Sequence, residues 1–122
     1  MKKNLSITAL LGALAIILGA FGAHALKEKL LPETLQSFET AVRYQMYHVL
    51  VLLFVNIYHG FSNRTKNMIS YLFFMGILFF SGSIYAIAAG FNPKLIWFIT
   101  PLGGLFFIIG WIFMFYSFIK EK

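Results

Sequence analysis

The chain contains no cysteine and few charged residues. Of its 122 residues, 11% are charged and 60% are hydrophobic, whereas average globular proteins have about 25% charged residues. The absence of cysteine excludes disulfides, thiolate metal sites and thiol catalysis. The shortage of charge indicates that lipid, rather than water, surrounds most of the chain. A chain of this length leaves little room for a separate soluble unit, so residues 1–122 are expected to form one membrane domain.

Sequence motifs of common enzymes are also missing. The chain has no His-Glu-x-x-His helix for a catalytic zinc and no glycine-rich nucleotide loop between a strand and a helix. Acidic residues number only four against ten lysines and arginines, which gives a net charge of +6. The basic residues flank apolar stretches, so they are better explained as headgroup anchors than as nucleic-acid contacts. We therefore predict a protein that is not an enzyme, lies among membrane lipids, and needs neither nucleic acid nor a cofactor.

What the chain does contain is four long apolar stretches separated by short polar turns. Each approaches the roughly 20 residues that an α-helix needs to cross a hydrocarbon core about 30 Å thick. The expected fold is all-α, a bundle of four transmembrane helices. The predicted spans are residues 5–23, 41–60, 67–90 and 95–119. In the last span, Pro101 predicts a kink because it removes a backbone donor.

The N-terminal stretch also has the outline of a cleavable secretory signal. Lys2 and Lys3 precede the apolar run, and Ala23-His24-Ala25 is a small-x-small triplet. However, the run is longer than the roughly 7–15 residues of a usual signal core, and three further apolar stretches follow it. Retention as the first transmembrane helix is therefore the favoured interpretation.

The most polar segment lies between the first two spans and predicts a short amphipathic helix over residues 32–42. Pro32 and Glu33 suit the first turn of a helix. Apolar residues then recur at helical spacing up to Val42. We expect this helix to lie at the membrane interface, with direct continuation into the second span as the open alternative.

The basic residues predict the orientation of the chain. Six lie on the side of the termini and the middle turn: Lys2, Lys3, Arg64, Lys66, Lys120 and Lys122. Four lie on the other side: Lys27, Lys29, Arg43 and Lys94. Because cytoplasmic loops carry the excess of basic residues, both termini are expected in the cytoplasm. This difference of six basic residues to four becomes larger only if Arg43 lies inside the membrane.

Polar side chains gather where the second span enters the membrane, beside the apolar residues Val49 to Val55. Ionisable groups at such depth are costly, so they tend to face a bundle interior or a water-filled cavity. Glu39 and Arg43 are four residues apart, which suits an ion pair along one helix face. Polar residues of the other helices can meet them. The predicted polar cluster comprises His24, Glu39, Arg43, Tyr44, Gln45, Tyr47, His48, Ser81, Ser83 and Tyr85.

Two interpretations of this cluster stay open. In the first, it binds a small ligand or a lipid headgroup, or relays ions or protons with histidine as the titratable group. In the second, its hydrogen bonds only hold the helices together. The presence of two histidines, His24 and His48, also suggests the hypothesis of bis-histidine haem ligation, but no other feature of the sequence supports it.

Small residues recur every four positions in two of the spans. They favour an alternative to ligand binding, in which the chain is a structural or assembly protein. Ala15, Gly19 and Ala23 share one face of the first span, and a similar pattern runs from Gly82 to Gly90. Such faces allow helices to approach closely in lipid. The chain is thus a candidate homo-oligomer, or a scaffold for other membrane helices.

Four sequence blocks resemble one known family. The blocks are Gly19–His24, Ala41–His48, Phe80–Tyr85, and Thr100–Gly104 with Gly110-Trp111. In order and spacing they resemble the small bacterial membrane proteins catalogued as domain of unknown function 423, a family similar to eukaryotic transmembrane protein 256. One departure is Ala25, where the family usually has glycine. The resemblance implies a four-span, multi-pass protein of the bacterial plasma (inner) membrane with a retained N-terminal helix. It brings no established reaction, substrate or cofactor.

Overall fold

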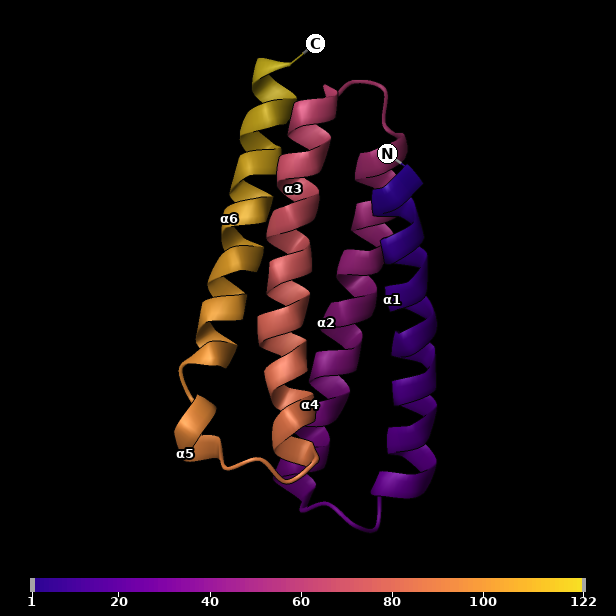
Figure 1. The fold of residues 1–122 in the computed structure, drawn as a ribbon, viewed down its shortest axis with the longest axis vertical. Coiled ribbons are helices and arrows are strands. Elements are labelled where there is room, and N and C mark those ends of the chain that lie inside the picture. Colours follow the sequence, from indigo (N-terminus) through magenta and orange to yellow (C-terminus); the bar gives the residue numbers. More distant parts are fainter. Residues whose placement is uncertain (1, 122) are drawn as a thin grey trace.

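The computed structural model describes residues 2–121, and this part of the chain contains helices and turns but no strand. Its long helical rods run side by side along one axis (Figure 1). The elements are α1 (Lys2–Phe21), η1 (Gly22–Leu26), α2 (Pro32–Ile57), α3 (Asn63–Gly76), η2 (Ile77–Ser81), α4 (Gly82–Ala88), α5 (Pro93–Ile96) and α6 (Ile99–Lys120). The two η segments are π-type turns that continue the helices before them. The prediction of an all-α chain is confirmed.

Three rods are long and apolar enough to cross a membrane. They are Lys2–Leu26, Asn63–Ala88 and Pro93–Lys120. The fourth rod, α2, has 26 residues and is therefore long enough. Polar residues such as Arg43, Gln45 and Asn56 interrupt its apolar sequence, and it is not among the three. Three of the four predicted spans thus correspond to candidate membrane spans.

The prediction of a separate interfacial helix over residues 32–42 is wrong, and the alternative of direct continuation into the second apolar stretch is the one observed. Those residues and the second apolar stretch form the single helix α2, which starts at Pro32 and ends at Ile57 rather than Gly60. No proline or glycine occurs after Pro32 until Gly60, so nothing interrupts the backbone hydrogen bonds. The amphipathic segment is simply the first part of a longer helix.

Helix boundaries elsewhere follow local capping. The third rod begins at Asn63, earlier than predicted, because the Ser62 side chain accepts a hydrogen bond from the Thr65 backbone N–H at 3.1 Å. The last rod breaks at Trp97 and Phe98, between α5 and α6. Pro101 therefore lies in the first turn of α6, where its missing N–H costs little. The helix is interrupted at Trp97 and Phe98, before the proline, and not at the predicted position.

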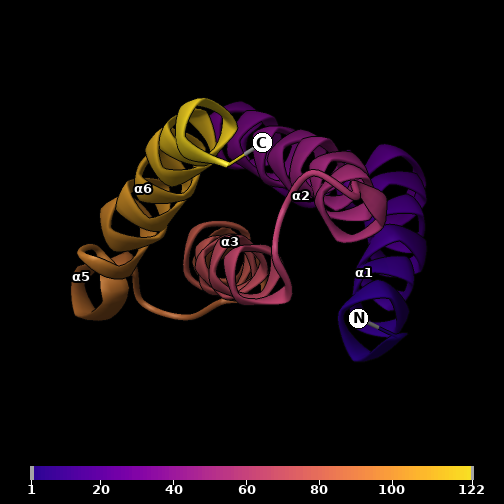
Figure 2. The ribbon, with the colours of Figure 1, turned by 90° about the horizontal axis from the view of Figure 1, so that it is seen from above.

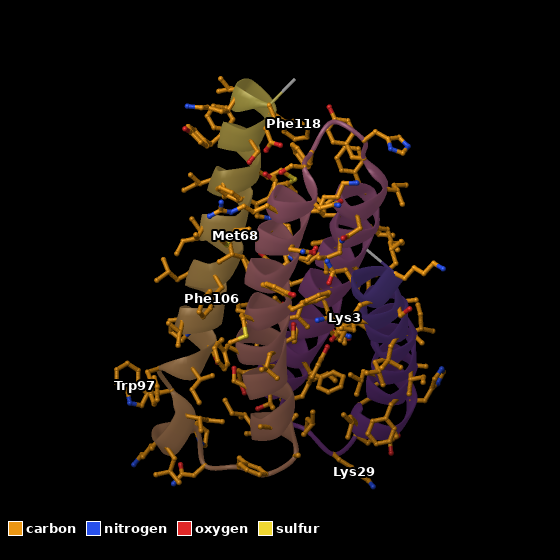
Figure 3. The ribbon with its side chains drawn as sticks, turned by 45° about the horizontal axis from the view of Figure 1, so that its top comes forward. Lys3, Lys29, Met68, Trp97, Phe106 and Phe118 are labelled. Atoms are coloured by element: carbon orange, nitrogen blue, oxygen red, sulfur yellow. The ribbon has the colours of Figure 1, made fainter. Side chains whose placement is uncertain are left out.

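The rods form an arc around α3. Seen from above, α6, α2 and α1 follow one another along the arc, and α3 lies on its inner side (Figure 2). The most extensive packing joins α1 to α2 and α3 to α6. The two termini lie at the same end of the bundle (Figure 1). Phe118 lies near that end, and Lys29 and Trp97 lie near the other (Figure 3).

The interior is apolar at its centre, and so is much of the outside. Leu52 of α2, Phe73 of α3 and Phe107 of α6 belong to one buried cluster. Gly103 allows a very close approach, because a Cβ atom there would lie 2.1 Å from the backbone nitrogen of Phe80 in η2. On the outer surface, Phe115 keeps 67% of its area exposed. Large apolar side chains of this kind cover the outside of the rods, which suits a lipid environment.

Candidate functional site

The structure divides the ten predicted cluster residues into an inner and an outer set. The inner set, buried or partly buried between the rods, is Gln45, His48, Ser81, Ser83 and Tyr85. The outer set, exposed on the surface of this chain, is His24, Glu39, Arg43, Tyr44 and Tyr47. One polar centre containing all ten residues therefore does not form.

His48 is the most constrained member of the inner set. Its Nδ1 lies 2.7 Å from the Tyr44 carbonyl oxygen, which can only accept, so Nδ1 carries the proton. The indole N–H of Trp111 in α6 donates to Nε2 at 3.0 Å. The imidazole also stacks on Phe107, with ring centroids 3.8 Å apart and planes 11° apart. Both ring nitrogens are thus occupied, and the neutral form of His48 connects α2 to α6.

Gln45 connects three rods one turn earlier along α2. Its Nε2 donates to the Leu11 carbonyl oxygen of α1 at 2.7 Å. Its Oε1 accepts a hydrogen bond from the Tyr85 hydroxyl of α4, also at 2.7 Å. Gln45 itself is only 2% exposed. The Gln45–Tyr85 pair therefore holds α1 and α4 on the same side of α2.

The two serines of the inner set have separate partners. Ser81 is fully buried, and its hydroxyl donates to the Ala41 carbonyl oxygen of α2 at 2.8 Å. The Ser83 hydroxyl donates to the Phe80 carbonyl oxygen at 3.0 Å and shares a short hydrogen bond with the Thr100 hydroxyl. Ser83 thus belongs to the contact between α4 and α6. Among residues 2–121, every fully buried side-chain nitrogen or oxygen has a hydrogen-bond partner.

The outer set lacks the contacts that the sequence predicted. Arg43 donates from Nη2 to the Thr40 hydroxyl at 3.0 Å, and within residues 2–121 it forms no ion pair with Glu39. Tyr44 stacks on Phe80 with centroids 5.2 Å apart, but both Tyr44 and Tyr47 keep more than 40% of their area exposed. The polar groups of the outer face of α2 therefore have few partners within the chain.

The two histidines of the haem hypothesis do not meet. His24 lies exposed in η1, at the end of the first rod, and the two ring nitrogens of His48 already have partners. In the described part of the chain, no group of three or more His, Cys, Asp or Glu residues is placed to hold a metal ion.

A second buried polar layer was missed by the sequence analysis. Asn4 donates from Nδ2 to the side-chain oxygens of Asn56 at 3.1 Å and Asn67 at 2.8 Å. Asn56 in turn donates to the Ser70 hydroxyl at 2.8 Å and to the Leu52 carbonyl oxygen at 2.9 Å. These bonds connect α1, α2 and α3 near the end that holds the termini. Asn4, Asn56 and Ser70 are all at most 2% exposed.

The signal for this layer was present in the sequence. Asn56 ends an apolar run of α2, and Ser70 interrupts the apolar third stretch. The same rule that singled out His48, that polar groups within a span face the bundle interior, applies to both. Trp111, the partner of His48, was not among the predicted cluster residues, although its indole N–H is a donor that can bond to a polar group on a neighbouring helix.

An apolar groove opens between α1 and the rod formed by α3, η2 and α4. Its volume is about 350 Å³. The wall residues are Ile7, Leu11, Leu14, Leu18, Phe74, Ile77, Leu78 and Gly82, together with Gln45 and Tyr85. In the part of the chain that the structure describes, only the Gln45–Tyr85 pair therefore brings side-chain polar atoms into this groove.

The sequence is similar to bacterial proteins that are named as membrane proteins. The family described as "Protein of unknown function (DUF423)" matches residues 18–104. A UPF0382 membrane protein of Staphylococcus saprophyticus is 43% identical over 114 residues, which cover 93% of this chain and 94% of that protein. A UPF0382 membrane protein of Haemophilus influenzae is 38% identical over 121 residues, which cover 99% and 97%. No solved structure matches the chain significantly.

Proposed function

This chain belongs to the DUF423 family of bacterial membrane proteins, as its motifs predicted, and we propose that it acts by binding rather than by catalysis. The proposed ligand is a membrane lipid or a lipid-like molecule, whose apolar chain lies in the groove between α1 and the α3–α4 rod. The observation that carries the proposal is an apolar groove with one polar pair, Gln45 and Tyr85, in its wall.

The size and chemistry of the groove support this ligand class. Its volume of about 350 Å³ falls within the range of roughly 300–1,000 Å³ that small-molecule sites occupy. Eight apolar wall residues provide contact for a hydrocarbon chain. The Tyr85 hydroxyl donates its hydrogen to Gln45, so its oxygen still has a lone pair for a ligand hydroxyl or ammonium group. That oxygen is the proposed point of specificity.

The geometry favours binding over a proton relay. A relay needs each group to accept a proton and pass it on. His48 faces a carbonyl oxygen on one side and the Trp111 indole N–H on the other, and an indole nitrogen is a donor only. A path for protons through His48 therefore ends at Trp111.

Filling the groove tests the binding proposal. Leu78→Trp adds a large side chain to the groove wall, and Ile108→Trp makes the same change at an exposed position of α6 that does not line it. Native mass spectrometry of the proteins extracted from membranes measures the lipid that remains bound. We expect the Leu78 variant to lose bound lipid and the Ile108 variant to retain it. Equal retention by both variants contradicts the proposal.

We also propose that α2 crosses the membrane as a fourth span. The first rod runs from the end with the termini to the other end, and α3 starts again beside the termini (Figure 1). The connecting chain must return across the bundle, and α2 is the helix that does so. Since Arg43 then lies within the membrane, the basic residues divide six to three in favour of termini in the cytoplasm. The proposed location is the bacterial plasma (inner) membrane.

The absence of cysteine makes this orientation directly testable. Single cysteines at His59, in the turn between α2 and α3, and at Phe91, in the turn after α4, report opposite ends of the bundle. A membrane-impermeant maleimide should label the Phe91→Cys variant in intact cells and the His59→Cys variant only after lysis. The reverse result places the termini outside.

Self-association is a second candidate function, and the exposed position of Arg43 favours it. Arg43 lies 11 residues after Pro32 and 14 before Ile57, close to the middle of α2. A charged side chain at the centre of a span costs about 2.5–3.5 kcal/mol on insertion scales. A second copy that covers the outer face of α2 removes this cost, and the exposed Glu39 supplies a carboxylate of opposite charge.

An oligomerisation measurement tests this candidate. Arg43→Leu should reduce crosslinked dimers in native membranes, because the polar contact between copies is lost. Arg64→Leu, which removes a basic residue from the exposed start of α3, serves as the matched control and should leave the dimers unchanged. If wild-type protein forms only monomers, or if both variants associate equally, self-association through this face is excluded.

A further inference from the structure

Lys66, in the second turn of α3, is a buried basic residue close to the end that holds the termini. It is only 5% exposed. Together with Asn56, Asn63 and Asn67 it lines a pocket of about 120 Å³. This volume is well above the roughly 10–15 Å³ that one water molecule needs, so the pocket has room for a larger polar group.

Among the described residues, no acidic side chain lines this pocket. Within residues 2–121, Lys66 makes neither a hydrogen bond nor an ion pair. Because every fully buried side-chain nitrogen there has a partner, the Lys66 nitrogen is not itself fully buried, and the residue lines the pocket. Glu121 at the same end of the bundle accepts hydrogen bonds from Ser62 and Thr65 instead. The Lys66 ammonium therefore provides three donors and a positive charge to the pocket.

The neighbouring asparagine adds a further donor. The side-chain oxygen of Asn67 accepts a hydrogen bond from Asn4 at 2.8 Å, which leaves the Asn67 amide –NH₂ group for other acceptors. The pocket also lies at the N-terminal end of α3, where the helix dipole favours negative charge. Donors and positive potential from separate sources thus meet at one pocket.

We propose that this pocket binds a phosphate group, with Lys66 as its charged ligand and the Asn67 amide as a hydrogen-bond donor. The chemistry suits the phosphodiester of an anionic lipid headgroup as well as inorganic phosphate. The pocket shares no wall residue with the groove, so either proposal can fail without the other.

The first experiment uses the wild-type protein and measures how fast an amine-reactive reagent labels Lys66, by mass spectrometry. Lys29 and Lys94, at the other end of the bundle, serve as internal references. The two probes are inorganic phosphate, compared with chloride at equal ionic strength, and phosphatidylglycerol, compared with phosphatidylcholine in nanodiscs. At a probe concentration about ten times Kd, labelling of Lys66 should fall about tenfold, because only the free protein reacts.

The outcomes distinguish the sources of phosphate. Protection by phosphatidylglycerol alone identifies a lipid headgroup, and protection by inorganic phosphate alone identifies a free anion. Protection by both identifies the shared phosphate chemistry. Unchanged labelling with both probes overturns the proposal, as does equal protection of Lys66, Lys29 and Lys94.

A pair of variants then separates this site from general surface charge. Lys66→Gln and Arg64→Gln each remove one positive charge from α3, but only Lys66 lines the pocket. The increase in thermal unfolding temperature caused by the protecting probe should disappear in Lys66→Gln and persist in Arg64→Gln. Equal loss in both variants shows attraction by surface charge and overturns the proposal.

Discussion

The inner and outer faces of α2 carry similar polar residues under opposite conditions. On the inner face, Gln45, His48 and Asn56 are at most 5% exposed, and each forms hydrogen bonds to at least one other helix. On the outer face, Arg43 bonds, within residues 2–121, only to Thr40 of the same helix, and Tyr47 is 52% exposed. One helix thus combines an inner face whose polar groups bond to other helices with an outer face whose arginine bonds only within its own helix, among the residues that the structure describes.

The difference teaches how burial in a membrane bundle should be interpreted. A polar side chain whose donor and acceptor atoms are all occupied within the chain, as in His48, holds helices together and offers little to a ligand. A polar side chain that lies at mid-span without such bonds is costly in lipid, so it indicates a contact with something outside the chain. The candidate contact residues for a second copy are therefore on the outer face, and the inner face supplies the frame.

The largest effect is expected from Asn56, which joins three helices. Asn56→Leu removes the hydrogen bonds to Asn4 and Ser70 and should lower the free energy of unfolding by about 1–3 kcal/mol, since interhelical bonds in membranes contribute about 0.6–1.7 kcal/mol each. Unfolding by sodium dodecyl sulfate in mixed micelles, followed by circular dichroism, measures the change. A variant as stable as wild type contradicts the view that the inner face holds the bundle together.

A smaller effect is expected at His48, and its neighbour Tyr47 provides the matched comparison. His48→Phe keeps an aromatic ring beside Phe107 but leaves the Trp111 indole N–H without its acceptor, which should cost about 1 kcal/mol. Tyr47→Phe removes an exposed hydroxyl from the outer face and should change the monomer by less than about 0.5 kcal/mol. The same micelle unfolding measures both variants. Equal losses would mean that the two faces do not differ within the monomer.

The sequence predicted the rods well because apolar length is a strong signal. The first, third and fourth apolar stretches correspond to the three candidate membrane spans found among the described residues. Their ends were less accurate, because the Ser62 cap and the break at Trp97 depend on local hydrogen bonds. The separate interfacial helix failed because a change in polarity along α2 was interpreted as a boundary, although no helix-breaking residue occurs there.

The division of the polar cluster could not be predicted in the same way. In a soluble helix, the apolar stripe identifies the face that packs inward. In lipid, the outside of a rod is as apolar as its inside, so this pattern gives little information about direction. Tyr47 and His48 are adjacent in the sequence, yet only the packing of Phe107 and Trp111 against α2 places one inside and the other outside.

Glu121 provides the reference case of a polar group that has partners but lies outside the candidate spans. Its carboxylate accepts hydrogen bonds from the Thr65 hydroxyl and the Ser62 backbone N–H. These two bonds, the Thr65 bond first, lower the pKa of Glu121 below its ordinary value. The contact therefore stabilises the folded chain at pH values above the ordinary pKa, and this stabilisation is lost as the pH falls through the lowered folded-state pKa.

The expected effect at Glu121 is the smallest, because its carboxylate is partly exposed and water competes for its hydrogen bonds. Unfolding measured between about pH 7 and pH 3 should show a slightly steeper loss of stability in wild type than in Glu121→Gln, which cannot titrate. Glu33→Gln, a similar change at the exposed start of α2, is the control and should follow wild type. If Glu121→Gln destabilises the protein at neutral pH as much as Asn56→Leu, exposure does not weaken polar contacts here, and the distinction between the two faces of α2 loses its physical basis.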